Sequence, residues 1–123
     1  MNNESKIIFL VDDNASNLTM GRNVLSDSHT VYTCNSGERL FRLLERITPH
    51  LILLDVEMPE MNGHEVMIRL KDNSNTADIP VIFLTGHDNE ENETKGRALG
   101  VKDYITKPFS PLLLLSRIEK HLS

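Results

Sequence analysis

The sequence predicts an α/β fold, a doubly wound parallel sheet of five strands with helices on both faces. Two observations carry this prediction. Apolar runs without alternation, such as residues 7–11 and 51–54, are typical of strands buried on both faces. Segments with apolar residues at helical spacing separate these runs, and strand and helix patterns alternate five times along the chain.

The five predicted strands are short, apolar or β-branched, and bounded by polar or turn-forming residues. They are residues 6–11, 30–34, 51–55, 80–85 and 103–106. Two of them run directly into carboxylates, at Asp12 and at Asp55. Pro59 and Gly63 then turn the chain away from the third strand.

A helix is predicted after each strand. Asn14 and Ser36 can cap the first two helices, residues 62–72 form the third, residues 89–99 the fourth, and Pro111 opens the fifth. The residues expected to face the sheet are Leu18, Gly21, Val24, Leu25, Leu40, Leu43, Leu44, Ile47, Val66, Met67, Leu70, Leu114, Leu115, Ile118 and Leu122. The fourth helix is expected to be held weakly, because Ala98 and Leu99 are nearly all its apolar surface and Gly100 closes it.

Length and charge narrow the function classes. A chain of 123 residues is expected to form one domain. The net charge of −5 argues against direct nucleic-acid binding, and the apolar runs are too short to cross a membrane. The single Cys34 excludes an internal disulfide, which suits a cytoplasmic protein. The five histidines lack metal-ligand spacing, so no zinc site is expected.

Four strand ends carry polar residues that fit one chemistry. They are Asp12 and Asp13, Asp55, Thr85 and Lys107. In a parallel sheet these ends share one edge, which is where open α/β sheets bind ligands. Clustered carboxylates repel unless a cation lies among them, and oxygen ligands at an open edge suit Mg²⁺. A Lys and a hydroxyl beside them can hold a phosphoryl group. Each residue alone is an ordinary turn or surface residue, whereas their joint occurrence predicts a site.

These residues resemble the receiver domain of bacterial two-component response regulators, over essentially the whole chain. The matching pieces are VDDN at 11–14, LILLDVEMPEMNG at 51–63, PVIFLTG at 80–86, ALG at 98–100 and DYITKPF at 103–109. The resemblance implies a flavodoxin-like strand order 2-1-3-4-5 and a single receiver domain over residues 1–123, either stand-alone or excised from a longer protein.

The resemblance implies a role for each matching residue. Asp55 would accept phosphate from a phosphohistidine on a sensor histidine kinase or phosphotransfer protein. Asp12, Asp13, Asp55 and the backbone carbonyl of Glu57 would share Mg²⁺, and the aspartyl phosphate would reset by hydrolysis. The protein would then be a switch and not a multiple-turnover enzyme.

Further roles follow from the same resemblance. Thr85, Gly86 and Lys107 would bind the phosphoryl oxygens, and Thr85 and Tyr104 would change position on activation. The bond before Pro108 would be cis. Glu57 and His87 are candidates for tuning the lifetime of the phosphoryl group. Gly86 stands where Ala or another small residue is commoner, which lends its loop extra freedom.

The output surface is expected on the fourth helix, fifth strand and fifth helix. Leu113 is predicted to point away from the core and Leu112 to lie at the edge of the apolar stripe. An exposed Leu beside charged residues suits an interface with an output domain or a second copy. The sequence does not identify the kinase or the output.

Two other functions remain open at this stage. A phosphatase with an aspartyl-phosphate intermediate needs an acid near the nucleophile, and Glu57 has a suitable spacing from Asp55. The paired Asp12 and Asp13 favour the switch over this enzyme. A flavin-binding domain of the same strand order needs a Gly- and hydroxyl-rich phosphate loop after the first strand, which this chain lacks.

Overall fold

The computed structural model describes residues 5–86, 90–107 and 110–122. Its strands form one parallel sheet in the predicted order β2-β1-β3-β4-β5. The strands are β1 (Ile7–Val11), β2 (Thr30–Cys34), β3 (Leu51–Asp55), β4 (Val81–Thr85) and β5 (Asp103–Thr106). The helices are α1 (Ala15–Leu25), α2 (Gly37–Leu44), α3 (Gly63–Lys71), α4 (Glu90–Leu99) and α5 (Pro111–Leu122). Within the described ranges, no helix has the length and apolar character needed to cross a membrane.

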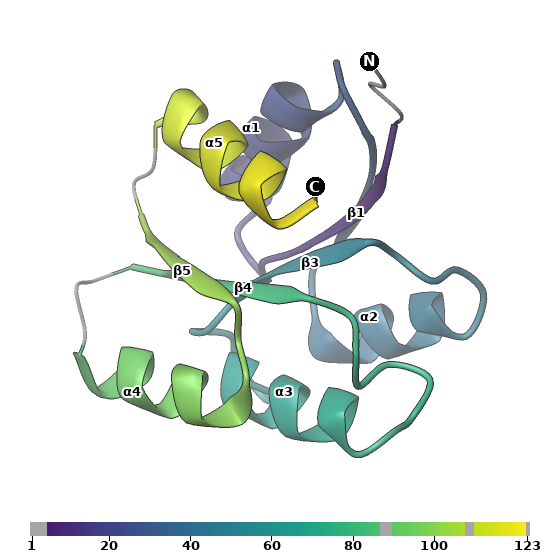
Figure 1. Ribbon diagram of the computed structural model, residues 1–123, viewed down its shortest axis with the longest axis vertical. Helices are drawn as coiled ribbons and strands as arrows, with labels where there is room; N and C mark the ends of the chain where they lie inside the picture. Colours follow the sequence, from purple (N-terminus) through teal and green to yellow (C-terminus); the bar gives the residue numbers. More distant parts are fainter. Residues whose placement is uncertain (1–4, 87–89, 108–109, 123) are drawn as a thin grey trace.

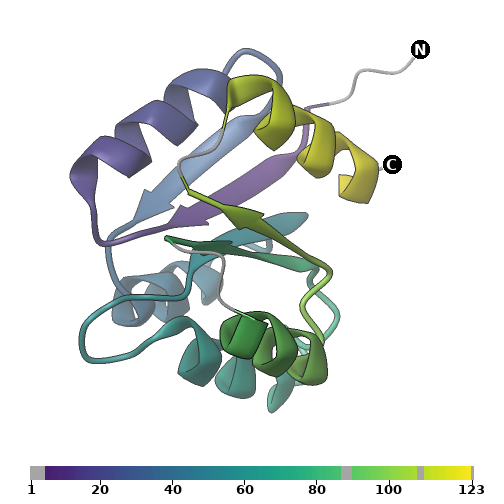
Figure 2. The same cartoon turned by 90° about the vertical axis from the view of Figure 1, so that its left-hand side faces the viewer.

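The sheet is covered on both faces. Helices α1 and α5 lie on one face and α2, α3 and α4 on the other (Figure 1). Figure 2 shows the same three layers from the side. The chain steps from β1 outward to β2, and then back across β1 to β3, so the strand order reverses between β1 and β3. The carboxyl ends of strands at such a reversal are the usual ligand site of this architecture.

Two apolar clusters explain the unalternated sequence of the central strands. Alternate side chains of one strand enter different clusters: Phe9 packs towards α2 and α3, whereas Ile8 and Leu10 pack towards α1 and α5. All five residues of β3 and of β4 are buried. Because both faces of these strands are covered, each position needs an apolar residue, until the strand ends at the polar edge.

The predicted helix caps are formed. Asn14 accepts a hydrogen bond from the Asn17 N–H, and Ser36 accepts one from the Arg39 N–H. Gly100, with φ of 98°, ends α4 in the left-handed conformation. In α3 the cap is reciprocal, because the Glu65 carboxylate also accepts from the Asn62 N–H. The caps at Asn14, Ser36 and Asn62 fix where α1, α2 and α3 begin after the carboxyl ends of the preceding strands.

Several predicted details are wrong. α2 ends at Leu44, because the Glu45 N–H turns back to carbonyls of the last turn, and Ile47 packs on the core from beyond the helix. Ala98 is exposed, whereas Gly96 is buried against the sheet and Leu99 packs on the core. Leu112, expected at the edge of the stripe, is 80% exposed, more than Leu113 at 41%.

Candidate functional site

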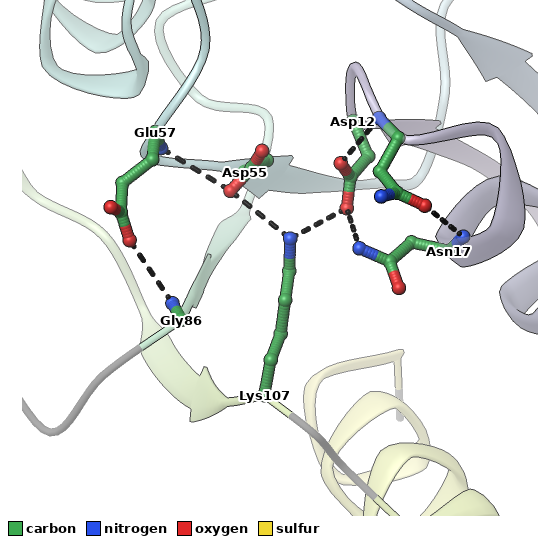
Figure 3. A network of polar contacts seen from close by, with 7 residues as sticks. Asp12, Asn17, Asp55, Glu57, Gly86 and Lys107 are labelled. Carbon is green, nitrogen blue, oxygen red and sulfur yellow. Dashed lines mark hydrogen bonds and ion pairs between the residues drawn. The ribbon is translucent and has the colours of Figure 1, made fainter.

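Asp12 follows β1 directly and is completely buried. Its carboxylate accepts hydrogen bonds from the Asn14 N–H at 3.0 Å and from the Asn17 amide at 3.2 Å. It also accepts one from the Lys107 ammonium at 2.7 Å (Figure 3). These three donors compensate for the burial of a negative charge. Asp12 is therefore fixed in place by both the first turn of α1 and the end of β5.

Asp55 is the last residue of β3 and is 2% exposed. Its Oδ1 atom accepts a hydrogen bond from the Glu57 N–H at 3.2 Å and lies 3.2 Å from the Lys107 ammonium. The register of the sheet explains why these groups meet. Asp55 pairs with Leu84 on β4, and Thr85 pairs with Thr106 on β5, so Lys107 emerges at the same edge.

Lys107 bridges the two carboxylates. Its ammonium is 2.7 Å from Asp12 and 3.2 Å from Asp55. Burial alone would lower the pKa of Lys107, but the hydrogen bond that it donates to Asp12 and the charges of both carboxylates raise that pKa above the ordinary value. Lys107 is therefore a permanent cation at the centre of the site. Lys107 thus pairs with both carboxylates, and Asp12 is the nearer partner.

The pKa of Asp55 is raised to about 7. Burial is the main cause and the charge of Asp12 is the second, while Lys107 and the Glu57 N–H oppose them. One ammonium thus does not fully balance the carboxylates. Further positive charge would stabilise the ionised form of Asp55.

The carboxylates are arranged to supply that charge by binding a cation. One oxygen from each of Asp12, Asp13 and Asp55 lies within 4.8 Å of the others. Asp13 is exposed, which leaves the cluster open on one side. Hard oxygen donors with room for water are the environment that Mg²⁺ prefers. The residues therefore fit the predicted metal site, and a cation bound there would offset the charge of Asp12 that helps to raise the pKa of Asp55.

The β4 side of the site combines Thr85, Gly86 and Glu57. Thr85 is buried, and its carbonyl accepts a hydrogen bond from the Lys107 N–H at 2.6 Å. The Gly86 N–H donates to Glu57 Oε1 at 3.3 Å, so the Glu57 side chain spans from β3 to β4 beside Asp55 (Figure 3). The sequence singled out both residues but gave no reason to join them.

Tyr104 lies on β5, half-buried, with the Arg97 guanidinium 5.8 Å from the centroid of its ring. The predictions for His87 and for the bond before Pro108 fall outside the described residues.

His64 lies in the first turn of α3, and its ring is edge-on to Phe83 at 5.5 Å. Its Nε2 atom is buried without a partner in the described chain.

Sequence reasoning missed Asn17. Its side chain donates to Asp12 from the first turn of α1 (Figure 3). A signal was present, because a helix capped by Asn14 places position 17 in its first turn, and helical side chains lean back towards the N-terminus. A polar residue there faces the strand end.

Comparisons with known proteins agree with this geometry. The model of the response regulator receiver domain matches residues 8–119. A probable cyclic di-GMP phosphodiesterase of Vibrio cholerae is 42% identical over 115 residues, 94% of this chain and 26% of that protein. The alkaline phosphatase synthesis transcriptional regulatory protein PhoP of Bacillus subtilis is 35% identical over 94% of this chain and 48% of its own length. This chain thus spans between a quarter and a half of these relatives.

Solved structures show the same fold. The chemotaxis protein CheY4 of Vibrio cholerae superposes with a TM-score of 0.91 at 28% identity, covering 97% of this chain and all of that one. The receiver domain of DrrB activated with BeF3 superposes with a TM-score of 0.87 at 31% identity, covering 97% of this chain and 98% of that one. Fold, acidic cluster and sequence match agree, and the chain belongs to the response regulator receiver domains of two-component signal transduction.

Proposed function

We propose that residues 1–123 act as one receiver domain, a switch that accepts a phosphoryl group on Asp55 from a histidine kinase or phosphotransfer protein. The observation that carries the proposal is the position of Asp55. It is the residue of the acidic cluster that ends the central strand and also contacts Lys107. A phosphoryl group bonded there would lie beside the fixed cation of Lys107 at the end of β5 and close to the end of β4.

Phosphoryl transfer to Asp55 would form one bond to phosphorus and break another. A carboxylate oxygen of Asp55 attacks the phosphorus of a phosphohistidine, the P–N bond breaks, and the imidazole leaves with the bonding electron pair. Lys107 moves from Asp55 Oδ1 towards a phosphoryl oxygen while keeping Asp12 as its second partner. Water later attacks the phosphorus, the bond to the Asp55 oxygen breaks, and inorganic phosphate leaves. This resets the switch.

Asp12, Asp13, Asp55 and the backbone carbonyl of Glu57 would hold Mg²⁺. When bound, the ion supplies positive charge that offsets both the carboxylates and the phosphoryl oxygens. The attack needs Asp55 ionised, and its pKa of about 7 in the metal-free protein leaves part of it protonated near neutral pH. A nearby cation favours the ionised form, so metal binding and nucleophilicity are linked.

Activation would use Thr85, Gly86 and Tyr104. The hydroxyl of Thr85 and the N–H of Gly86 would bind phosphoryl oxygens, and Tyr104 would fill the space that Thr85 leaves. Support comes from the backbone hydrogen bond between Lys107 and Thr85, which joins the ends of β5 and β4. The change would reach an output domain or a second copy through α4, β5 and α5, where Leu112 and Leu113 are exposed. We place this function in the cytoplasm, where sensor kinases act.

A phosphatase is the second candidate, with Glu57 as its acid. The Glu57 carboxylate accepts a hydrogen bond from the Gly86 N–H, a role that suits an ionised group better than a proton donor. The switch therefore remains the better-supported function. An assay with a generic phosphomonoester separates the two functions. Turnover would support the phosphatase, and its absence would support the switch.

The phosphoacceptor is tested by incubation with acetyl phosphate and Mg²⁺, followed by mass spectrometry of the intact chain. One phosphoryl group is expected on the wild type and none on Asp55→Asn. The matched control is Asp78→Asn, an exposed carboxylate of the loop before β4, which should be labelled like the wild type. Undiminished labelling of Asp55→Asn would overturn the assignment.

A further inference from the structure

The Glu57 side chain closes one side of the site. Its own N–H donates to Asp55 Oδ1, and its carboxylate accepts from the Gly86 N–H. Figure 3 shows Glu57 and Lys107 on opposite sides of Asp55, each extending between the end of β3 and the ends of neighbouring strands. A single residue therefore contacts both the proposed phosphoacceptor and a backbone donor of β4.

The Gly86 N–H is a suitable donor for an anion. It follows Thr85 at the carboxyl edge of β4, one strand away from Asp55. Glu57 Oε1 already occupies this donor with a charged oxygen, at an N···O distance of 3.3 Å. A phosphoryl oxygen carried on Asp55 would offer the same kind of acceptor to the same N–H.

We propose that Glu57 is an internal competitor of the phosphoryl group: its carboxylate occupies the Gly86 N–H before phosphorylation and has to leave before a phosphoryl oxygen takes that donor. The inference rests on the proposed function and adds an autoinhibitory contact to it. Glu57 is a positioning residue here, because it acts through Gly86 and not on the reacting atoms.

The glycine at position 86 permits this contact. A Cβ atom placed there would lie 3.2 Å from Glu57 Oε1, closer than an ordinary van der Waals contact. The backbone of Gly86 is not in the left-handed region, so alanine can adopt it without strain. Gly86→Ala should therefore displace the Glu57 carboxylate and leave the backbone in place. It tests the same contact from the other partner.

Charge repulsion would favour release of the Glu57 carboxylate from Gly86 once Asp55 is phosphorylated. Lys107 pairs with Asp12 and Asp55, and within the part of the chain that the structure describes no basic side chain pairs with Glu57. A phosphoryl group would bring further negative charge close to this carboxylate, and like charges repel. Glu57 is exposed, so water offers it an alternative once it leaves Gly86.

The experiment measures the affinity for beryllofluoride, a phosphoryl mimic, in the presence of Mg²⁺. Removal of one net hydrogen bond and one like charge predicts that Glu57→Ala binds the mimic about threefold to tenfold more tightly than the wild type. Glu57→Gln, which keeps a neutral acceptor, should lie between them. Gly86→Ala should also bind more tightly, and the double variant Glu57→Ala with Gly86→Ala should gain no more than Glu57→Ala alone.

The Gly86 amide resonance in ¹⁵N NMR reports the contact without any phosphoryl chemistry. In the unphosphorylated protein, Glu57→Ala should shift this resonance and speed exchange of its proton, while beryllofluoride should bring wild type and variant together. Glu60→Gln is the matched control, because it removes an exposed carboxylate from the same loop and should leave both readouts unchanged.

The outcomes separate the two proposals. Equal beryllofluoride affinity in wild type, Glu57→Ala and Glu57→Gln would overturn the competitor and leave the switch intact. Additive gains from Glu57→Ala and Gly86→Ala would overturn it too, because the two substitutions would then act separately. Absence of beryllofluoride binding in every variant, with the fold intact by circular dichroism, would overturn the proposed function together with this inference.

Discussion

Helices α3 and α4 lie side by side on one face of the sheet but are held by different means. α3 begins with a reciprocal cap and buries Gly63, Val66, Met67 and Leu70. In α4, among the side chains described from residue 93 onward, Gly96 is buried and Leu99 half-buried. Among the described residues, α3 is thus anchored by several buried side chains, and α4 by the half-buried Leu99 and the close approach of its backbone at Gly96.

This difference predicts that α4, the less stable of the two helices, lies next to the residues of the proposed switch. Helices with few buried apolar contacts open at a lower free-energy cost than their neighbours. α4 follows the loop after Thr85, and its Arg97 lies over Tyr104. The helix that is cheapest to displace is therefore the one that contacts the residues expected to move. α3, which starts just after the Asp55 loop, is expected to stay in place.

The largest test compares one anchor from each helix. Met67→Ala should lower the free energy of unfolding by about 2–5 kcal/mol, because Met67 is fully buried and its loss leaves a cavity. Leu99→Ala should cost about 1 kcal/mol, because only part of its side chain leaves water. Urea unfolding measures both values. Equal losses would contradict the difference between the helices.

The next test removes the charge of Asp55 at the end of β3. The pKa of Asp55 is raised from 3.8 to about 7 in the folded protein, so ionisation opposes folding. The destabilisation is absent below the unfolded pKa near 4, grows as pH rises to about 7, and is complete above it. Asp55→Asn should therefore stabilise the metal-free protein on the order of 2 kcal/mol at pH 8 and have little effect at pH 4.

The two helices should respond differently to Asp55→Asn. Global stabilisation should slow amide exchange in α3, whereas α4, which opens locally, should exchange as in the wild type. Millimolar Mg²⁺ should raise the melting temperature of the wild type through mass action and reduce its difference from Asp55→Asn. A pH-independent difference between the two proteins would mean that Asp55 has an ordinary pKa.

The strand ends were predictable and the contacts between them were only partly so. Unalternated apolar runs located the central strands, and the polar residue after each run gave Asp12, Asp55, Thr85 and Lys107. Parallel topology then brings these residues to one edge without any knowledge of side-chain conformation. Lys107 and Asp55 meet at this edge, with the ammonium 3.2 Å from the carboxylate.

Other features depend on close packing, which sequence patterns do not encode. The sequence counted Ala98 among the few apolar residues of the fourth helix, but the helix turns Gly96 inward, because a residue without a side chain lets its backbone reach the Phe83 ring. The Glu57–Gly86 contact depends on a side-chain conformation across two strands. Leu112 is more exposed than its helical position suggested, and no contact in the described chain explains the difference from Leu113.

Gly96→Ala tests the close approach of α4. A Cβ atom at this position would lie 2.8 Å from a ring carbon of Phe83, which is fully buried and has little room to move. Alanine favours helix by about 1 kcal/mol over glycine, but the overpacking should exceed this and give a net loss of about 1–2 kcal/mol. Thr94→Ala, exposed on the same helix, is the control and should change stability little. A stabilised Gly96→Ala would show that α4 lies farther from the sheet.

The smallest expected effect comes from Arg97. Its guanidinium lies 5.8 Å from the centroid of the Tyr104 ring and pairs with Glu93 at 3.4 Å. Exposed contacts of this type contribute below about 1 kcal/mol, so Arg97→Ala should leave global unfolding nearly unchanged. It should nevertheless speed amide exchange in α4 relative to α3, because α4 has few other anchors. Glu93→Gln removes the ion pair and keeps the ring contact, so it should speed exchange less. Hydrogen exchange of α3 and α4 is measured in the wild type, Arg97→Ala and Glu93→Gln. If Arg97→Ala speeds exchange in α3 more than in α4, Arg97 supports the whole domain and not α4 alone.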